Sequence, residues 1–410
     1  MTTQTAPPDM ARARWWPGVV LALVLARLAM SWILLNDIPR LQEHDGWYFP
    51  HGGDNDLYFK MAQSLAAGQP IALPLGIGQP LVMAGLLKLT GASSFRDILP
   101  WLVIINGFVL GGLSVWVMAQ LAYRLTHDRR LALAAAGLWA FSAYALWLVL
   151  GLHGEARQLR AVYVPRQLWM NGLTDPPALF MSLLGLLLVV QAKEMRPDGR
   201  RQTALFLIGG LTLGLAAVFR FQSTAILGMV FLALLWVRQW RGLLLCGLGL
   251  LIGFTPQFWY NAIANGHVLN MPYISGWLGF DKNGQAYFNY TLMHFSPQFL
   301  GDSLNMLTRG NWLVATGEAA VAVAAIYLFI RCWRQCGSFA ALIMFGAPLA
   351  SFGLHISTFV FTIDPIRFTL PALSIGIPAA TWAASFVAAE LRTKLHFPSS
   401  TRPLISRARK

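Results

Sequence analysis

Long hydrophobic segments follow one another along most of the chain and are separated by short polar stretches. The first segment, residues 15–36, is long enough to cross a hydrocarbon core of about 30 Å as an α-helix. Repetition of this pattern predicts a polytopic membrane protein with about ten spanning helices. The spans are expected at residues 15–36, 99–122, 131–150, 174–192, 203–219, 222–237, 243–262, 312–330, 338–361 and 368–389.

A shorter apolar segment, residues 78–91, decides the predicted topology. Its length of about 14 residues is below what a spanning helix needs. If it crossed the membrane, the basic cluster at 124–130 would lie outside, although Lys and Arg favour cytoplasmic loops. Residues 78–91 are therefore predicted to form a juxtamembrane or re-entrant helix. The basic clusters of the later loops then all fall on the cytoplasmic side.

This topology divides the chain into three parts. Residues 1–14 and the basic tail 391–410 are expected in the cytoplasm, and residues 15–390 form the transmembrane domain. The long outer loop 263–311 is rich in aromatic residues, so it is predicted to pack as a lid or platform. The extracytoplasmic loops are expected at 37–98, 151–173 and 263–311.

Composition agrees with this assignment and narrows the class of protein. Hydrophobic residues make up 56% of the chain, charged residues 12%, and the mean hydropathy is +0.54, which leaves too little polar surface for a soluble protein. The predicted fold is therefore all-α and polytopic, with no soluble domain. The net charge of +14 comes from short basic clusters between hydrophobic runs, which orient helices and do not indicate nucleic-acid binding. The three cysteines are expected to be reduced.

The first outer loop carries the best candidate for chemistry. After Asp54 and Asp56 the apolar residues recur at helical spacing, which predicts a short amphipathic helix with Lys60 on its polar face. Asp54 stands where this helix would begin. One interpretation is that its carboxylate caps the helix; the other is that Asp54 and Asp56 form a catalytic or metal-binding pair at the water interface.

Other charged residues remain where membrane orientation does not require them. Individually each is more often a solvated charge than a ligand, but together they suit an anionic headgroup and a proton acceptor. Arg27 lies inside the first span and is predicted to be an ion-pair member or part of the site. The outer set includes Arg157, Arg160, Arg166, Asp175, Arg220 and Arg367.

Motifs in four places follow one another along the chain. The first outer loop reads GDNDLYFKMAQSLAAGQ and continues into PLGIGQPLVMAGLLKLTG, and the second loop leads into GLTDPPALFMSLLGLLL. Further on the chain reads TPQFWYNAIANGHV and, at the last outer turn, DPIRFTLPAL. In this order and with this sidedness they resemble the GT-C glycosyltransferases, the membrane superfamily that includes protein O-mannosyltransferases and the transferases that modify lipid A.

The resemblance implies roles for individual residues. Asp54 is expected to be the catalytic base and to bind metal or acceptor, and Asp56 completes an Asp-x-Asp-like pair. Asp175 corresponds to the acid of the second loop. Arg220 and Arg367 match arginines that face the same cavity. A divalent cation, Mg²⁺ or Mn²⁺, held by the first two aspartates is compatible with this pattern but not required by it.

Two residues close to Asp54 in the sequence are expected to bind substrate. Two departures from the family pattern change which residues are expected to bind the donor phosphate. Tyr58 and Lys60 are the substrate-binding candidates. Many relatives have Glu where this chain has Asn55, and a basic residue in the proline-rich turn where it has residues 77–79. The donor phosphate is then expected to bind an arginine of the second loop: Arg157, Arg160 or Arg166.

The resemblance implies an enzyme that transfers a sugar from a polyprenyl-phosphate donor to a hydroxyl of a glycan, lipid or protein acceptor, with inversion. The protein is expected in a bacterial inner membrane with its site facing the periplasm or exterior. Two alternatives stay open. A transporter or flippase of lipid-linked sugars would use intramembrane charges such as Arg27 and Glu318. A polysaccharide polymerase or ligase would use a lipid-diphosphate donor.

Overall fold

The computed structural model describes most of the chain between residues 15 and 394, and the helices that it shows agree with the predicted spans. Nine helices in the described part are long and apolar enough to cross a membrane, and the shorter apolar helix Phe221–Trp236 corresponds to the tenth expected span. The architecture is that of a helical polytopic membrane protein, as the sequence predicts. The described residues are 15–37, 54–71, 73, 75–152, 164, 168–170, 172–195, 199–269, 277–280, 286–289, 297–308, 312–357 and 365–394.

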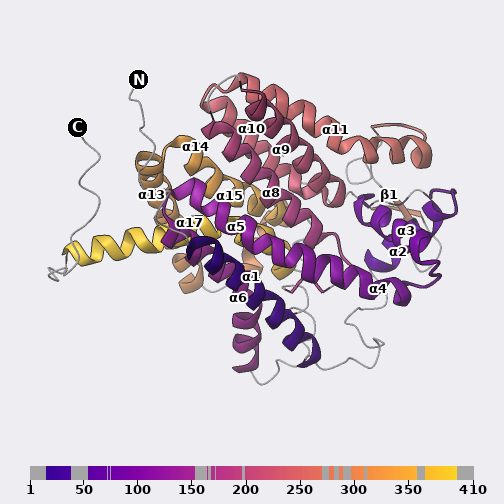
Figure 1. The fold of residues 1–410 in the computed structure, drawn as a ribbon, viewed down its shortest axis with the longest axis horizontal. Coiled ribbons are helices and arrows are strands. Elements are labelled where there is room, and N and C mark those ends of the chain that lie inside the picture. Colours follow the sequence, from indigo (N-terminus) through magenta and orange to yellow (C-terminus); the bar gives the residue numbers. More distant parts are fainter. Residues whose placement is uncertain are drawn as a thin grey trace.

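The long helices form one bundle (Figure 1). π-Helical turns interrupt two of them. Helix α4 continues through a π-helical segment, η1, into α5, so that residues 95–126 form one span. Helices α14 and α15 are joined in the same way by η3. The bundle elements are α1 (Trp15–Asp37), α4 (Phe95–Val103), η1 (Ile104–Leu110), α5 (Gly111–Thr126), α6 (Arg129–Leu152), α8 (Asp175–Glu194), α9 (Arg200–Phe219), α10 (Thr224–Trp236), α11 (Trp240–Asn265), α13 (Trp312–Cys336), α14 (Ser338–Ala341), η3 (Leu342–Gly346), α15 (Ala347–Ile356) and α17 (Pro365–Lys394).

Two short helices, α2 (Asp54–Ala66) and α3 (Gly78–Thr90), pack on each other at one end of the bundle (Figure 1). Each has 13 residues and is therefore about 20 Å long, too short to cross a hydrocarbon core. The prediction of short helices in the first outer loop is confirmed. Helix α2 begins at Asp54 itself, so this aspartate belongs to the first helical turn.

The long loop differs from an all-helical expectation in one respect. Strands β1 (Trp277–Phe280) and β2 (Ala286–Asn289) pair antiparallel, with Trp277 opposite Asn289. The sequence favours strands here because two of the four residues in each segment are aromatic. A short helix, α12 (Pro297–Thr308), precedes α13.

Glycines explain the close contact between α9 and α11. A Cβ atom added at Gly249 would lie 2.1 Å from the carbonyl oxygen of Leu207, and one added at Gly253 would lie 2.2 Å from that of Leu211. Small residues let two helix backbones approach in this way inside a membrane. The rigid pair of α9 and α11 then positions the ends of both helices beside α3.

Arg27 lies fully buried near the middle of α1 and links this helix to α6. Its Nη1 donates to the carbonyl oxygen of Ala140 at 3.1 Å, and its guanidinium lies 5.8 Å from the ring centre of Trp139. The Trp139 indole in turn donates to Ser114 on α5 at 2.8 Å. Of the two predicted roles for Arg27, these contacts favour a structural one between helices.

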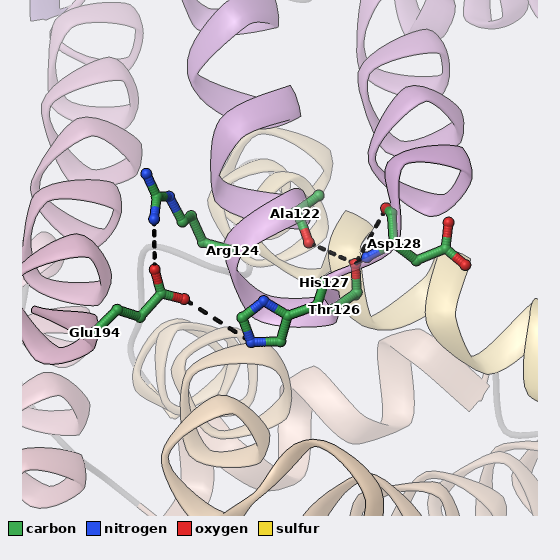
Figure 2. Close-up of polar contacts among 6 residues, drawn as sticks. All are labelled: Ala122, Arg124, Thr126, His127, Asp128 and Glu194. Atoms are coloured by element: carbon green, nitrogen blue, oxygen red, sulfur yellow. Dashed lines mark hydrogen bonds and ion pairs between the residues drawn. The ribbon is translucent and has the colours of Figure 1, made fainter. Parts of the chain in front are cut away.

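The end of the bundle away from α2 and α3 carries an exposed polar cluster, shown in Figure 2. Arg124, in the last turn of α5, donates to Glu194 Oε2 at 2.7 Å, where α8 ends. His127 Nε2 lies 4.0 Å from the other carboxylate oxygen of Glu194. This end corresponds to the side predicted to be cytoplasmic from its basic loops.

Candidate functional site

The segment between α2 and α3 is held by polar side chains at the end of α11. The Tyr260 hydroxyl donates to the carbonyl oxygen of Ile71. Gln257 Oε1 accepts the backbone N–H of Ile77 at 3.0 Å, and its Nε2 donates to Asn261 Oδ1 at 2.9 Å. Gln257 and Asn261 are almost fully buried. These contacts satisfy the Ile71 carbonyl oxygen and the Ile77 N–H, and they tie the start of α3 to the end of α11.

Two glycines bring the start of α3 against the end of α9. A Cβ atom at Gly76 would lie 2.6 Å from the carbonyl oxygen of Val218, and one at Gly78 would lie 2.7 Å from Phe219 Cγ. No larger residue fits at either position without moving the neighbouring backbone or ring. The first turn of α3 is therefore next to Arg220, which follows Phe219 directly and caps the C-terminal end of α9.

A buried ion pair between Asp175 and Arg220 lies at the same end of the bundle. Asp175 is the first residue of α8, where the positive end of the helix dipole stabilises a carboxylate. The side chain of Arg220 is 6% exposed and that of Asp175 is 13% exposed. The sequence predicted both residues as site candidates, and the structure brings them into direct contact although 44 other residues separate them in the chain.

His355 is a third member of this buried group and was not found from the sequence. It lies at the end of α15, which packs on the short helix η2 (Phe221–Ser223) that follows Arg220. The ring is 2% exposed. Its Nδ1 lies 2.6 Å from the carbonyl oxygen of Ser351, so this nitrogen carries the hydrogen. An ionisable residue inside an apolar span is the signal that could have identified it.

The candidate residues on α2 are more varied in burial than the Asp175–Arg220 pair. Asp56 pairs with Lys60 one turn later at 2.8 Å, and both side chains are well exposed, 40% and 57%. Tyr58 is 3% exposed and belongs to the hydrophobic cluster that joins α2 and α3 to the bundle, so its ring packs the helix in place. Asp54, in the first turn, is partly exposed.

A divalent cation does not fit the two aspartates of α2 as a chelating pair. Residues two apart on an α-helix point to nearly opposite faces, so the carboxylates of Asp54 and Asp56 diverge. Asp56 is also occupied by Lys60. Within the described residues no group of three His, Cys, Asp or Glu side chains is placed to hold a metal.

Four of the predicted arginines lie in parts of the chain that the structure does not describe in full. Arg367 belongs to the first turn of α17, but its side chain is outside the described atoms. Arg157, Arg160 and Arg166 lie outside the described residues. Their predicted contact with the donor phosphate stays a prediction.

The fold places the chain in a recognisable class of membrane protein. The sequence matches no protein-family profile and no curated protein. The structure, however, is similar to the oligosaccharyltransferase of Archaeoglobus fulgidus in complex with Zn and sulfate, with a TM-score of 0.52 and 14% identity over 92% of this chain. The apo form of the same enzyme gives a TM-score of 0.50 and 13% identity over 94% of this chain. The predicted all-α polytopic fold is confirmed, and its helices are arranged as in these oligosaccharyltransferase structures.

The likeness covers only part of those enzymes. The present chain corresponds to 50% and 52% of the two solved chains, respectively. At this identity the comparison establishes the arrangement of helices and assigns no residue.

Proposed function

We propose that this protein is a membrane glycosyltransferase of the GT-C type, which transfers a sugar from a polyprenyl-phosphate donor to an acceptor hydroxyl. The observation that carries the proposal is the placement of Asp54 in the first turn of α2, at the end of an oligosaccharyltransferase-like bundle that also holds the buried Asp175–Arg220 pair. A partly exposed carboxylate and a buried guanidinium at one end supply a proton acceptor and an anion-binding group.

In the proposed reaction Asp54 accepts the proton of the acceptor hydroxyl as the hydroxyl oxygen attacks the anomeric carbon. The bond from that carbon to the phosphate oxygen breaks, and the lipid phosphate leaves with the electron pair. Arg220 provides positive charge close to the leaving group, and Asp175 fixes the orientation of its guanidinium. A single attack with one base and no enzyme nucleophile inverts the configuration of the sugar.

The side of the membrane on which the reaction takes place is part of the proposal as well. The reaction is proposed to take place on the extracytoplasmic side of a bacterial inner membrane, because the basic clusters lie at the other end of the bundle. The similar enzyme was crystallised with Zn, whereas Asp54 and Asp56 of this chain lie two residues apart on α2 and do not form a chelating pair.

The test is sugar transfer by Asp54→Asn in purified membranes supplied with a radiolabelled polyprenyl-phosphate sugar. General-base catalysis contributes roughly 10²–10⁴-fold, and a loss of that size is expected. Asp302→Asn is the matched control, because Asp302 is exposed on α12. A normally folded Asp54→Asn protein with unchanged transfer would exclude Asp54 as the base.

The same assay separates the two other classes of function. Release of a lipid monophosphate agrees with the proposal, and release of a lipid diphosphate identifies a polymerase or ligase. Movement of the lipid-linked sugar across vesicle membranes with no transfer identifies a flippase.

A further inference from the structure

Three buried side-chain amides lie at the α2 and α3 end of the bundle without complete hydrogen bonding. Asn55 belongs to the first turn of α2, Gln79 to the first turn of α3, and Gln222 to η2; they are 6%, 1% and 7% exposed. Asn55 Oδ1, Gln79 Nε2 and Gln222 Oε1 have no hydrogen-bond partner among the residues that the structure describes. Because a buried amide without a partner is costly, such a group calls for a ligand or a bound water.

The fold gathers the three amides at one end of the bundle. A Cβ atom at Gly78 would touch Phe219, so Gln79, the next residue, lies near the end of α9, where η2 with Gln222 follows. Helices α2 and α3 run in the same general direction, because they pack along their lengths and Gln63, near the end of α2, reaches Ser93, just beyond the end of α3. Their first turns, which carry Asn55 and Gln79, therefore lie at the same end of the pair.

Two of the carboxylates at this end of the bundle are already paired with cations. Asp175 is paired with Arg220, and Asp56 with Lys60. The unsatisfied atoms of the three amides are uncharged: two are acceptors and one is a donor. A side-chain amide can rotate by 180° and so exchange its donor and acceptor atoms. A hydroxyl group both donates and accepts, so sugar hydroxyls complement such a set. An ammonium or a carboxylate on the sugar would require an uncompensated opposite charge.

We infer that Asn55, Gln79 and Gln222 form a subsite for the hydroxyl groups of an uncharged sugar on the lipid-phosphate donor. The inference rests on the proposed function and narrows its substrate class: a neutral hexose or pentose is accepted, whereas an amino sugar or a uronic acid is bound poorly. The position also fits the reaction, because the subsite adjoins Arg220, which is proposed to act at the phosphate.

The experiment measures donor binding to the purified full-length protein in nanodiscs by thermal shift. The probes are polyprenyl-phosphate glucose, polyprenyl-phosphate aminoarabinose and polyprenyl-phosphate galacturonic acid. The glucose donor is expected to bind at least about tenfold more tightly than either charged donor, since a site built for hydroxyl groups leaves its amides unpaired with the wrong ligand. Tighter binding of a charged donor would overturn the inference and leave the proposed function intact. Absence of a shift with all three donors would overturn both.

Variants test the amides themselves. Gln79→Met keeps the size of the side chain and removes the amide, so glucose-donor affinity should fall about tenfold or more while the melting temperature of the free protein stays equal or rises. Gln69→Met changes an exposed residue of the neighbouring loop and should alter neither quantity. A lower melting temperature with unchanged affinity would show that Gln79 is structural. Gln222→Met is measured in parallel with the same criteria and decides the matter if Gln79→Met does not fold.

Discussion

Helix α8 has an acidic residue at each end, and each one pairs with an arginine from another helix. At its first residue Asp175 meets Arg220, with side chains only 13% and 6% exposed. At its last turn Glu194 meets Arg124, with side chains 22% and 38% exposed. The helix dipole stabilises a carboxylate at the first position and disfavours one at the second. The two pairs are therefore alike in composition and opposite in environment.

The difference indicates what each pair is for. A solvent-accessible pair gains little free energy, and its loss is tolerated. A buried pair carries a desolvation cost that apolar side chains of similar size would avoid, so it is a poor means of gaining stability. A buried pair at the end of the bundle that also holds three buried amides, in contrast to the partly exposed Arg124–Glu194 pair at the other end of α8, supports the proposal that the site lies at the first end of α8.

The largest expected effect follows from removing one partner of the buried pair. Arg220→Met leaves Asp175 as an uncompensated buried charge, which should lower the free energy of unfolding by roughly 3–5 kcal/mol. Thermal or denaturant unfolding of the purified protein in detergent measures this loss. A loss below about 1 kcal/mol, the value of an exposed pair, would remove the contrast between the two ends.

The double variant Asp175→Leu with Arg220→Met sharpens the same contrast. With neither charge left, most of the stability lost in the single variant should return, because no ion remains buried. Transfer activity should stay lost, because the proposed anion-binding group is absent. Recovery of activity together with stability would show that the pair has only a structural role.

Sequence reasoning predicted the fold well because hydrophobic length and charge placement are local properties. The spans and the short helix at 78–91 follow from segments of a few turns each. The pairing of Asp175 with Arg220 was not predicted, although both were candidates, because it depends on how α8 and α9 meet in space.

His355 and the amide of Gln79 were missed for a related reason. Each lies among apolar residues in the sequence, and only burial shows that its polar atoms face the protein interior. The strands β1 and β2 were missed because an aromatic outer loop predicts packing without saying which secondary structure provides it.

An intermediate effect is expected from the polar anchor beside the first end of α8. Gln257→Leu removes the acceptor of the Ile77 N–H and the donor to Asn261, so buried polar groups lose their partners. The expected cost is about 1–3 kcal/mol in the free energy of unfolding. The matched control is Gln63→Leu, an exposed residue on α2, which should change stability by less than about 0.5 kcal/mol. Equal losses in the two variants would argue against a specifically rigid site.

The smallest effect is expected at the other end of α8. Glu194→Gln removes the negative charge that Arg124 and His127 share but keeps a side chain of the same size (Figure 2). Since the pair is partly exposed, the loss in the free energy of unfolding should be about 0.2–1 kcal/mol and should shrink further at high salt, where the charges are screened. Replacing a carboxylate at the C-terminal end of a helix also relieves its repulsion by the helix dipole, which offsets part of that loss. The free energy of unfolding, measured in low and in high salt, checks the size of the loss and its salt dependence. The transfer assay is run alongside and should show unchanged activity. A loss of several kcal/mol, or a fall in transfer, would mean that this end of the bundle contributes to the site as much as the first.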